Sequence, residues 1–423
     1  MQAAGEGGEA PAAPLLTVAF HPDPVFIGRR HVLPEGEPIA LGRLSSHFGR
    51  GALDHDVVSR QHVRITRSGE RVSVQDLGSR NGTSINGVRI GEQVLEPGDV
   101  VGVGPVLLLH HLGPVLAPRL RPCALVGASG AHARLLAEIE RAASHRGCVL
   151  IQGETGVGKE LVATEIHGRS GLAGRLVAVN CGALADGVVH SELFGHVRGA
   201  FSGAGRERAG LVRAAGGGTL FLDEVGDGSP ALQASLLRPI EQAEYRPVGS
   251  DELAHTDARF VAASHVPLEP AVESGRFRRD LYGRISRWVI DVPPLRQRPD
   301  DIIPLAQHFA RQAAGRPVRL SRALALALLR HPWPGNARQL RAVIEQALAD
   351  VSPSGELDAG GRMAERLLAA GPCGPPAFEA AGGSVKRLAA ELGVSRQSVY
   401  RWIEQAGIDL PDLRHRQGHQ RTS

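Results

Sequence analysis

The sequence is poor in cysteine and has no long hydrophobic run, and each absence excludes a class of protein. Its four cysteines show neither C-x-x-C spacing nor histidines at the spacing of a zinc site. This pattern is typical of free thiols in a reducing compartment and argues against a disulfide-stapled secreted domain. No apolar run reaches the roughly 18 residues that a membrane span needs, and the N-terminal stretch MQAAGEGGEAPAAP lacks the features of a signal peptide. We therefore expect a cytoplasmic protein without a membrane partner.

Lysine is also scarce. Lysine and arginine together number 48, yet only Lys159 and Lys386 are lysines. Arginine fills nearly every basic position, so a remaining lysine indicates a role that arginine fills poorly, such as a compact ammonium group at a phosphate. The formal net charge is only +4, so any binding of nucleic acid must come from a local basic patch.

The texture of the sequence changes along the chain and predicts several domains. Period-two alternation around turn signals favours an all-β sandwich over residues 15–112. Apolar strands alternating with helical stretches favour a parallel α/β sheet over 123–292, followed by helical segments over 293–350. A compact all-α unit is expected at 384–409. The segments between and beyond these are a disordered lead-in (1–14), a linker (113–122), a second linker (351–383) and a basic tail (410–423).

The segment GETGVGKE predicts a phosphate-binding loop. It follows an apolar strand and opens a helix, which is the context that makes the G-x-x-x-x-G-K-[ST] pattern specific. Glycines allow the turn that directs backbone N–H groups at phosphates, and the helix N-terminus adds a favourable field. Glu160 replaces the usual hydroxyl residue, so a magnesium ion needs a ligand from elsewhere. The expected nucleotide-binding residues are Gly153, Glu154, Thr155, Gly156, Val157, Gly158, Lys159 and Glu160.

Two adjacent acids, Asp223 and Glu224, end the later buried strand in GGGTLFLDE. Ligands bind beyond the carboxyl ends of strands in open α/β sheets. Asp223 would hold the magnesium ion, and Glu224 would polarise an attacking water. The alternative is a strand that merely ends in two solvated acids, which the preceding phosphate loop disfavours. Together the two motifs predict a nucleotide hydrolase.

Residues 123–350 resemble the sigma-54-dependent enhancer-binding activators, which are AAA+ ATPases. Members carry a glutamate after the lysine of the phosphate loop, as Glu160 does here, and a GAFTGA loop that grips the sigma factor, which the segment GAFSGA resembles. The resemblance implies ATP and Mg2+ as cofactors, the sigma-54 RNA polymerase holoenzyme as partner, and a closed homo-oligomeric ring, usually a hexamer. The implied sigma-factor-binding residues are Gly199, Ala200, Phe201, Ser202, Gly203 and Ala204.

Further site residues carry over from this family by position. Asn180 would report the nucleotide state by a hydrogen bond to Glu224, and Arg338 in the helical lid would sense the phosphates. Arg278 and Arg284 would reach the ATP of a neighbouring subunit, where a guanidinium group accelerates hydrolysis by about 10³- to 10⁵-fold.

One position departs from the family. His265 stands at the strand end where members carry an asparagine that senses phosphate. Neutral imidazole also donates one hydrogen bond, but with different reach and pH dependence. The resemblance therefore implies ATPase activity with slowed or altered coupling.

The sandwich segment resembles a forkhead-associated domain, a reader of phosphothreonine peptides, through IALGR, VVSRQHVRI, DLGSRNGTSING and LEPGDVVGVG. A phosphate charge near −2 needs charge-assisted donors on loops held by a rigid sheet. By position, Arg43 and Ser59 would bind the phosphate, and His62 would brace the loops. The residues that would shape the rest of the peptide site are Arg60, Arg80 and Asn81.

The segment SVKRLAAELGVSRQSVYRWIEQAGI predicts two helices joined by a Gly-containing turn. It resembles the Fis-type helix-turn-helix that ends these activators, which implies enhancer DNA as a partner. A serine is suited to cap the second helix, whose first turns carry side chains suited to base edges and phosphates. The expected DNA-binding residues are Ser395, Arg396, Gln397, Ser398 and Arg401.

The combined prediction is a transcriptional activator in which a phosphothreonine-reading sandwich regulates a DNA-bound ring ATPase. Two alternatives stay open. His265 favours a non-hydrolysing DNA-bound scaffold that reads phosphopeptides. An AAA+ remodeller of another target is disfavoured by GAFSGA. A small-molecule phosphotransferase is less favoured still, because nothing in the sequence resembles an acceptor-substrate site.

Overall fold

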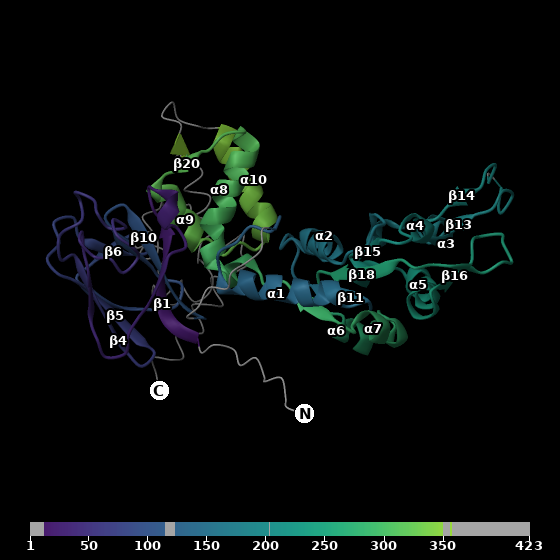
Figure 1. Cartoon of the computed structure of the whole chain (residues 1–423), viewed down its shortest axis with the longest axis horizontal. Helices are drawn as coiled ribbons and strands as arrows, with labels where there is room; N and C mark the ends of the chain where they lie inside the picture. Colours follow the sequence, from purple (N-terminus) through teal and green to yellow (C-terminus); the bar gives the residue numbers. More distant parts are fainter. Residues whose placement is uncertain (1–11, 115–122, 203, 350–355, 358–423) are drawn as a thin grey trace, which may run out of the picture.

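The computed structural model describes residues 12–114, 123–202, 204–349 and 356–357. They form an antiparallel β-sandwich, a parallel α/β sheet and a helical lid, with the lid helices between the other two parts (Figure 1). This is the predicted fold class for these three parts. No helix within the described ranges is long and apolar enough to cross a membrane.

The sandwich consists of two antiparallel sheets, in the orders β2-β1-β10-β9-β6-β7 and β3-β4-β5-β8. Alternation directs side chains inward: Val63 and Ile65 of β4 are buried, while Arg64 between them is exposed. The strands are β1 (Ala12–Phe20), β2 (Arg30–Val32), β3 (Ile39–Leu41), β4 (Val63–Ser68), β5 (Arg71–Asp76), β6 (Thr83–Ile85), β7 (Val88–Ile90), β8 (Glu92–Leu95), β9 (Val100–Val103) and β10 (Val106–Pro114).

The sandwich begins and ends beyond the predicted boundaries. Residues 12–14, expected in the lead-in, pair with residues 112–114 of β10. The first two residues of the predicted linker therefore belong to β10. The extra pairs extend the longest ladder of the sandwich, and the apolar pattern alone did not indicate this extension.

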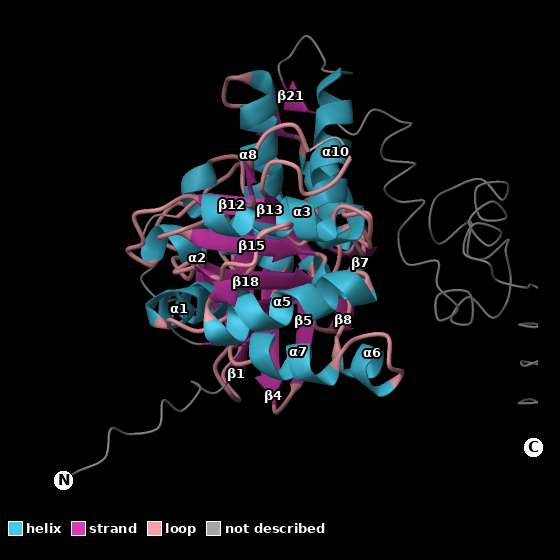
Figure 2. Cartoon of the chain, turned by 90° about the vertical axis from the view of Figure 1, so that its right-hand side faces the viewer, coloured by secondary structure: helices cyan, strands magenta, loops and turns pink. Residues whose placement is uncertain are grey.

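The α/β sheet has the strand order β12-β15-β18-β11-β19, and all its pairs are parallel. The inner strands β15 and β18 are apolar along nearly their whole length, because helices cover both faces. Helices α1 and α2 pack on one face, and α3, α5 and α7 on the other (Figure 2). The strands are β11 (Val149–Gln152), β12 (Leu176–Asn180), β15 (Thr219–Asp223), β18 (Arg259–Ser264) and β19 (Val289–Asp291).

The helices of this part differ widely in length. They are α1 (Gly130–Ser144), α2 (Lys159–Arg169), α3 (Val189–Phe194), α4 (Leu211–Ala214), α5 (Pro230–Gln242), α6 (Glu269–Glu273) and α7 (Arg279–Ile285). Ser129 and Ser229 cap α1 and α5 by accepting hydrogen bonds from the backbone N–H groups of the first turn. Two short ribbons extend from the end of the sheet remote from the lid: β13 (Gly195–His196) with β14 (Arg208–Ala209), and β16 (Glu244–Tyr245) with β17 (Ala254–His255) (Figure 1).

The lid contains α8 (Ile302–Ala314), α9 (Arg322–Arg330) and α10 (Asn336–Ala349), with the short pair β20 (Arg319–Leu320) and β21 (Glu356–Leu357). Trp333 is fully buried in its core, and its indole N–H donates to the carbonyl oxygen of Leu328 at 2.9 Å. β21 lies beyond the predicted end of the lid at residue 350. The apolar core of the lid continues into the sandwich.

Candidate active site

The phosphate loop between β11 and α2 requires glycine at three points. Gly153, Gly156 and Gly158 have φ angles of 155°, 80° and 105°, which residues with a side chain rarely adopt. Gly156 also meets the lid, since a Cβ there would lie 2.4 Å from the carbonyl oxygen of Gly335. The loop thus closes tightly under the lid and leads directly into the N-terminus of α2, an arrangement suited to phosphate.

Lys159 is the first residue of α2 and is 7% exposed. Its Nζ donates to the carbonyl oxygen of Gly153 at 3.0 Å and lies 3.6 Å from Oε1 of Glu224. A buried ammonium group needs such partners. They hold it between the phosphate loop and the acids of β15, the position from which a lysine reaches the β- and γ-phosphates of a nucleotide.

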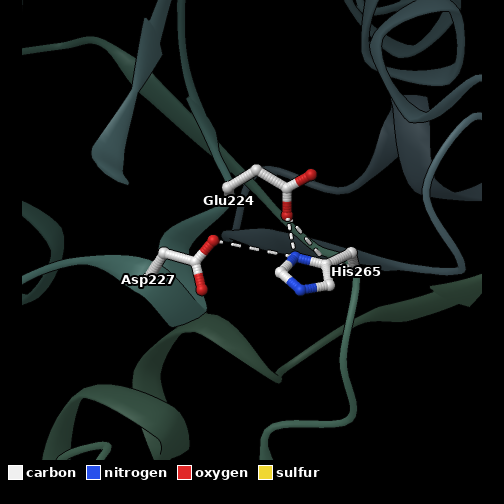
Figure 3. A group of neighbouring side chains, drawn as sticks. All are labelled: Glu224, Asp227 and His265. Atoms are coloured by element: carbon white, nitrogen blue, oxygen red, sulfur yellow. Dashed lines mark hydrogen bonds and ion pairs between the residues drawn. The ribbon is translucent and has the colours of Figure 1, made fainter. Parts of the chain in front are cut away.

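The acid pair lies at the carboxyl end of β15, beside the end of β18. Burial and the neighbouring charge of Glu224 raise the pKa of the half-buried Asp223. Glu224 has a left-handed backbone with φ of 51°, a strained conformation of the kind found at functional sites. Its Oε2 accepts a hydrogen bond from the backbone N of His265 at 3.1 Å and lies 2.6 Å from Nδ1 of the same residue (Figure 3). Asp227 approaches this Nδ1 at 3.8 Å.

Asn180, the predicted reporter of nucleotide state, lies opposite Asp223 in the pairing of β12 with β15. Its Oδ1 accepts a hydrogen bond from the backbone N of Ala183 at 3.1 Å and so caps a short 3-10 helix. Oε2 of Glu224 is held by His265 in this arrangement. The role assigned to Asn180 stays a prediction.

Two lid residues at the phosphate loop were missed by the sequence analysis. Asn336 is fully buried and donates through Nδ2 to Oε2 of Glu154 and to the carbonyl oxygen of Thr155, each at 3.1 Å. Its Oδ1 accepts from the backbone N of Leu295 at 2.8 Å. Arg296 forms a bidentate ion pair with Glu154 at 2.5 and 2.8 Å. These hydrogen bonds, from Arg296 first and Asn336 second, lower the pKa of Glu154 to about 2.

Arg338, the predicted phosphate sensor, lies in the first turn of α10. Its backbone N donates to the carbonyl oxygen of Gly156 at 3.3 Å, and its side chain is exposed. The residue is therefore at the rim of the phosphate loop. The sequence signal for the neighbouring contacts was the segment GNAR at the start of α10, which by itself does not indicate a partner.

Arg278 and Arg284, predicted to act on a neighbouring nucleotide, lie at the two ends of α7. Arg278 pairs with Asp280 at 2.7 Å, and Arg284 with Glu241 at 2.5 Å. Both guanidinium groups are partly exposed. Arg284 also lines a pocket at the amino ends of the strands, together with three further arginines, Arg146, Arg259 and Arg287.

The GAFSGA segment forms a tight turn at the tip of the β13–β14 ribbon. Gly199 N donates to the carbonyl oxygen of Ala204 at 2.8 Å, and Ala204 N to that of Phe201 at 3.0 Å. The Phe201 side chain is 48% exposed and meets the ring of His196 edge-on, with 4.9 Å between centroids. Gly203 lies outside the described residues. A large aromatic group is therefore presented to solvent by a small-residue turn.

The predicted peptide-binding residues of the sandwich gather on two loops. Arg43 follows β3 and donates to the carbonyl oxygens of Val58 at 3.1 Å and Asp56 at 2.8 Å, which holds its guanidinium group against the loop between β3 and β4. Gly42 has no space for a side chain, since a Cβ would lie 2.0 Å from the carbonyl oxygen of Arg60.

The second loop joins the first through side chains. Oγ of Ser59 accepts from the backbone N of Arg80 at 3.1 Å, and Asn81 donates to the carbonyl oxygen of Val57 at 2.7 Å. His62 is fully buried and accepts from the backbone N of Ser59 at 3.1 Å, as expected of a brace. Hydrogen bonds within the sandwich therefore fix both loops, while the hydrogen-bond donors of the loops remain at the surface. The predicted DNA-binding residues Ser395, Arg396, Gln397, Ser398 and Arg401 lie outside the described residues.

The fold and site together define an AAA+ ATPase. Its marks are a phosphate loop after β11, adjacent acids at the end of the inner strand β15, which β18 separates from β11, and a helical lid whose residues contact the loop. Comparison with protein families agrees. Residues 125–291 match the sigma-54 interaction domain, and residues 296–359 the AAA+ ATPase lid domain. The flanking parts match the FHA domain at 25–104 and a homeodomain-like domain at 377–411.

Comparison with individual proteins identifies the family within the AAA+ ATPases. The sigma54-dependent transcriptional activator SfnR of Pseudomonas putida is 45% identical over 247 residues, which is 57% of this chain and 68% of SfnR. The anaerobic nitric oxide reductase transcription regulator NorR of Vibrio vulnificus is 47% identical over 228 residues, 53% of this chain and 45% of NorR. The crystal structure of NtrX from Brucella abortus in complex with ATP aligns with a TM-score of 0.51 at 31% identity, over 69% of this chain and 71% of NtrX.

The chain therefore belongs to the sigma-54-dependent transcriptional activators, with an N-terminal forkhead-associated domain and a C-terminal helix-turn-helix. It spans more than half of SfnR but under half of NorR. The family expected from the sequence is confirmed. The sequence features that carried the expectation, GETGVGKE and GAFSGA, lie within the matched sigma-54 interaction domain.

Proposed function

We propose that this chain hydrolyses ATP in a ring of identical subunits and uses the cycle to convert the closed complex of sigma-54 RNA polymerase into the open complex. The observation that carries this proposal is the exposed Phe201 on a ribbon rooted in the ATPase core. Val225, which follows the catalytic acids, packs in one buried cluster with Leu193 and Phe194 of α3, and α3 leads directly into β13. A change at Glu224 thus has a short packed route to the tip.

Magnesium is proposed as the cofactor of this reaction, and the donors at the site suit it. Asp223 is a half-buried carboxylate, and the charges of Glu224, Lys159 and Glu160 all act on its pKa. Mg2+ prefers a few carboxylate oxygens together with substrate phosphates. Asp223 would hold the ion beside the phosphates, and the ion would neutralise charge on them. Glu224 would orient the attacking water.

The ring is proposed from the two arginines of α7. Their partners, Asp280 and Glu241, lie on α7 and α5 at the surface of the subunit. Exposed ion pairs of this kind contribute little to stability, so both guanidinium groups are available to a neighbour. A hexamer is the usual closed ring in this family.

The regulatory ligand is proposed to be a phosphothreonine peptide. Arg43, Ser59 and the backbone of Arg80 lie on two mutually braced loops. Such loops can offer charge-assisted donors to a phosphate with little loss of entropy. Enhancer DNA would be bound by the helix-turn-helix, so the activator acts in the cytoplasm where it meets the polymerase.

The test is ATP-dependent opening of a sigma-54 promoter by the holoenzyme, measured by strand reactivity. Glu224→Gln is expected to bind ATP without hydrolysing it, and Phe201→Ala to hydrolyse ATP without opening the promoter. Val188→Ala is a matched control, because Val188 is 47% exposed against 48% for Phe201. Promoter opening by Phe201→Ala at the wild-type rate would assign the ATPase to another target.

A further inference from the structure

The sandwich and the lid share a single apolar core. Phe20 of β1 and Leu107 and Leu109 of β10 are buried in the same cluster as Leu324 and Leu328 of α9. α9 also forms a polar contact with the sandwich, because Arg330 donates a hydrogen bond to the carbonyl oxygen of Asn86 at 3.1 Å. Domains joined by a large apolar interface do not move independently. The sandwich and the lid therefore share one continuous core, and we expect them to move together.

A buried ion cluster lies beside this apolar contact. Asp300 belongs to the 3-10 turn η5 (Pro299–Asp301), and its side chain is 2% exposed. One carboxylate oxygen lies 3.1 Å from Nε2 of His111 in β10 and 3.3 Å from a guanidinium nitrogen of Arg30 in β2. His111 Nε2 also lies 2.7 Å from Oγ1 of Thr17. Separating a buried carboxylate from its partners costs several kcal/mol, so the turn is fixed to the sandwich.

The same turn is fixed to the ATPase core on its other side. Asp301 is fully buried and accepts hydrogen bonds from the backbone N of Ala128 at 2.6 Å and of Ser129 at 2.7 Å, at the start of α1. Arg298, 5% exposed, lies 3.9 Å from Asp301 and donates to the carbonyl oxygen of Val157 at 3.0 Å. Val157 is a residue of the phosphate loop. One short turn therefore connects two sandwich strands with the loop that holds ATP.

We propose that Arg298 and Asp300 are positioning residues for ATP hydrolysis, through which the sandwich sets the shape of the phosphate loop. Two residues separated by one position have Cα atoms at most about 7 Å apart. The backbone between Asp300 and Arg298 is too short to accommodate a displacement of Asp300 by the sandwich. The displacement therefore moves Arg298 and, through its hydrogen bond, the carbonyl group of Val157. A test of this link needs only the ATPase activity of the chain. Its use by a phosphothreonine peptide rests on the proposed function.

The test measures steady-state ATP turnover of the full chain against ATP concentration, without polymerase, DNA or peptide. Asp300→Asn removes the charge that holds His111 and Arg30, and Arg298→Lys shortens the reach to Val157. Each is expected to raise KM for ATP by about 2- to 30-fold, the range for mutations along a coupling network, with kcat changed less than KM. Because each cuts the same connection, the double variant is expected to match the more affected single variant.

The matched control is Arg330→Met, which removes a contact between lid and sandwich outside the turn. It is expected to lower the unfolding midpoint while leaving KM for ATP unchanged. If Asp300→Asn fails to fold, His111→Leu takes its place, since Asp300 then keeps Arg30 as partner. An unchanged KM in the folded sandwich-side variant, or KM effects that multiply in the double variant, would overturn the proposal. Loss of promoter opening or of peptide binding does not bear on this result.

Discussion

The contact between His265 and Glu224 makes a prediction about the rate of ATP hydrolysis. Oε2 of Glu224 is engaged by both the backbone N and the imidazole of His265, and Oε1 faces Lys159 at 3.6 Å. A carboxylate whose two oxygens already have partners is poorly placed to accept a hydrogen bond from the attacking water. We therefore expect the imidazole contact to be a restraint that must break before each turnover.

The magnitude follows from the geometry. A hydrogen bond to a charged group contributes about 1.5–3 kcal/mol, and the side-chain exposures of 33% for His265 and 21% for Glu224 place this one at the low end. About 1.5–2 kcal/mol corresponds to roughly 10- to 30-fold in rate. His265→Ala removes the 2.6 Å contact and keeps the backbone hydrogen bond. Basal kcat is expected to rise by that factor.

The assay is phosphate release from the full chain at saturating ATP, with two further variants. His255→Ala is the matched control, because that histidine is 76% exposed and 3.9 Å from Glu244; its kcat should equal that of the wild type. His265→Ala combined with Glu224→Gln should be as slow as Glu224→Gln alone. A fall in kcat for His265→Ala would refute the reasoning and show that the imidazole orients Glu224 for catalysis.

Three further predictions concern the phosphate loop and the sandwich. Gly156→Ala should lose nucleotide binding, measured with a fluorescent ATP analogue, because its φ is 80° and a Cβ would lie 2.4 Å from the carbonyl oxygen of Gly335. The folded pKa of Glu154 is about 2, below its ordinary value of 4.5. The stability that its pair with Arg296 contributes should therefore be complete above pH 4.5 and be lost as the pH falls towards 2. Thermal unfolding of Arg296→Met and of the wild type across this pH range tests this. A difference in unfolding midpoint that grows on acidification would contradict it. Arg43→Ala should weaken binding of a phosphothreonine peptide library at least about tenfold, by loss of a charge-assisted contact; equal binding would remove Arg43 from the site.

Much of the active site could be predicted because its parts are local in sequence. The phosphate loop is one continuous segment between a strand and a helix, and the acids follow a single buried strand. Glu224 and His265 were each expected at a strand end, and the structure adds that the two strands are neighbours and that the side chains meet. The carboxyl ends of parallel strands lie at one edge of a sheet, so residues at strand ends are expected near the same site even before the strand order is known.

The contacts of the lid could not be predicted in this way. Asn336 and Arg296 meet Glu154 across 182 and 142 residues of chain, and nothing in a polar loop indicates so distant a partner. The shared apolar core of the sandwich and the lid was also not predicted, although the sequence contained one signal for it. Leu107, Leu108 and Leu109 are consecutive and all buried, and such a run in a strand indicates that both faces of the sheet are covered.

The isolation of Lys159 gives the experimenter a chemical handle. The chain carries one other lysine, Lys386, and Lys159 is 7% exposed with its ammonium group directed at the phosphate loop. In Lys386→Arg protein, the ε-amine of Lys159 is the sole side-chain amine for an amine-selective acylating reagent. The extent of its modification with and without nucleotide would then measure the average occupancy of the nucleotide site.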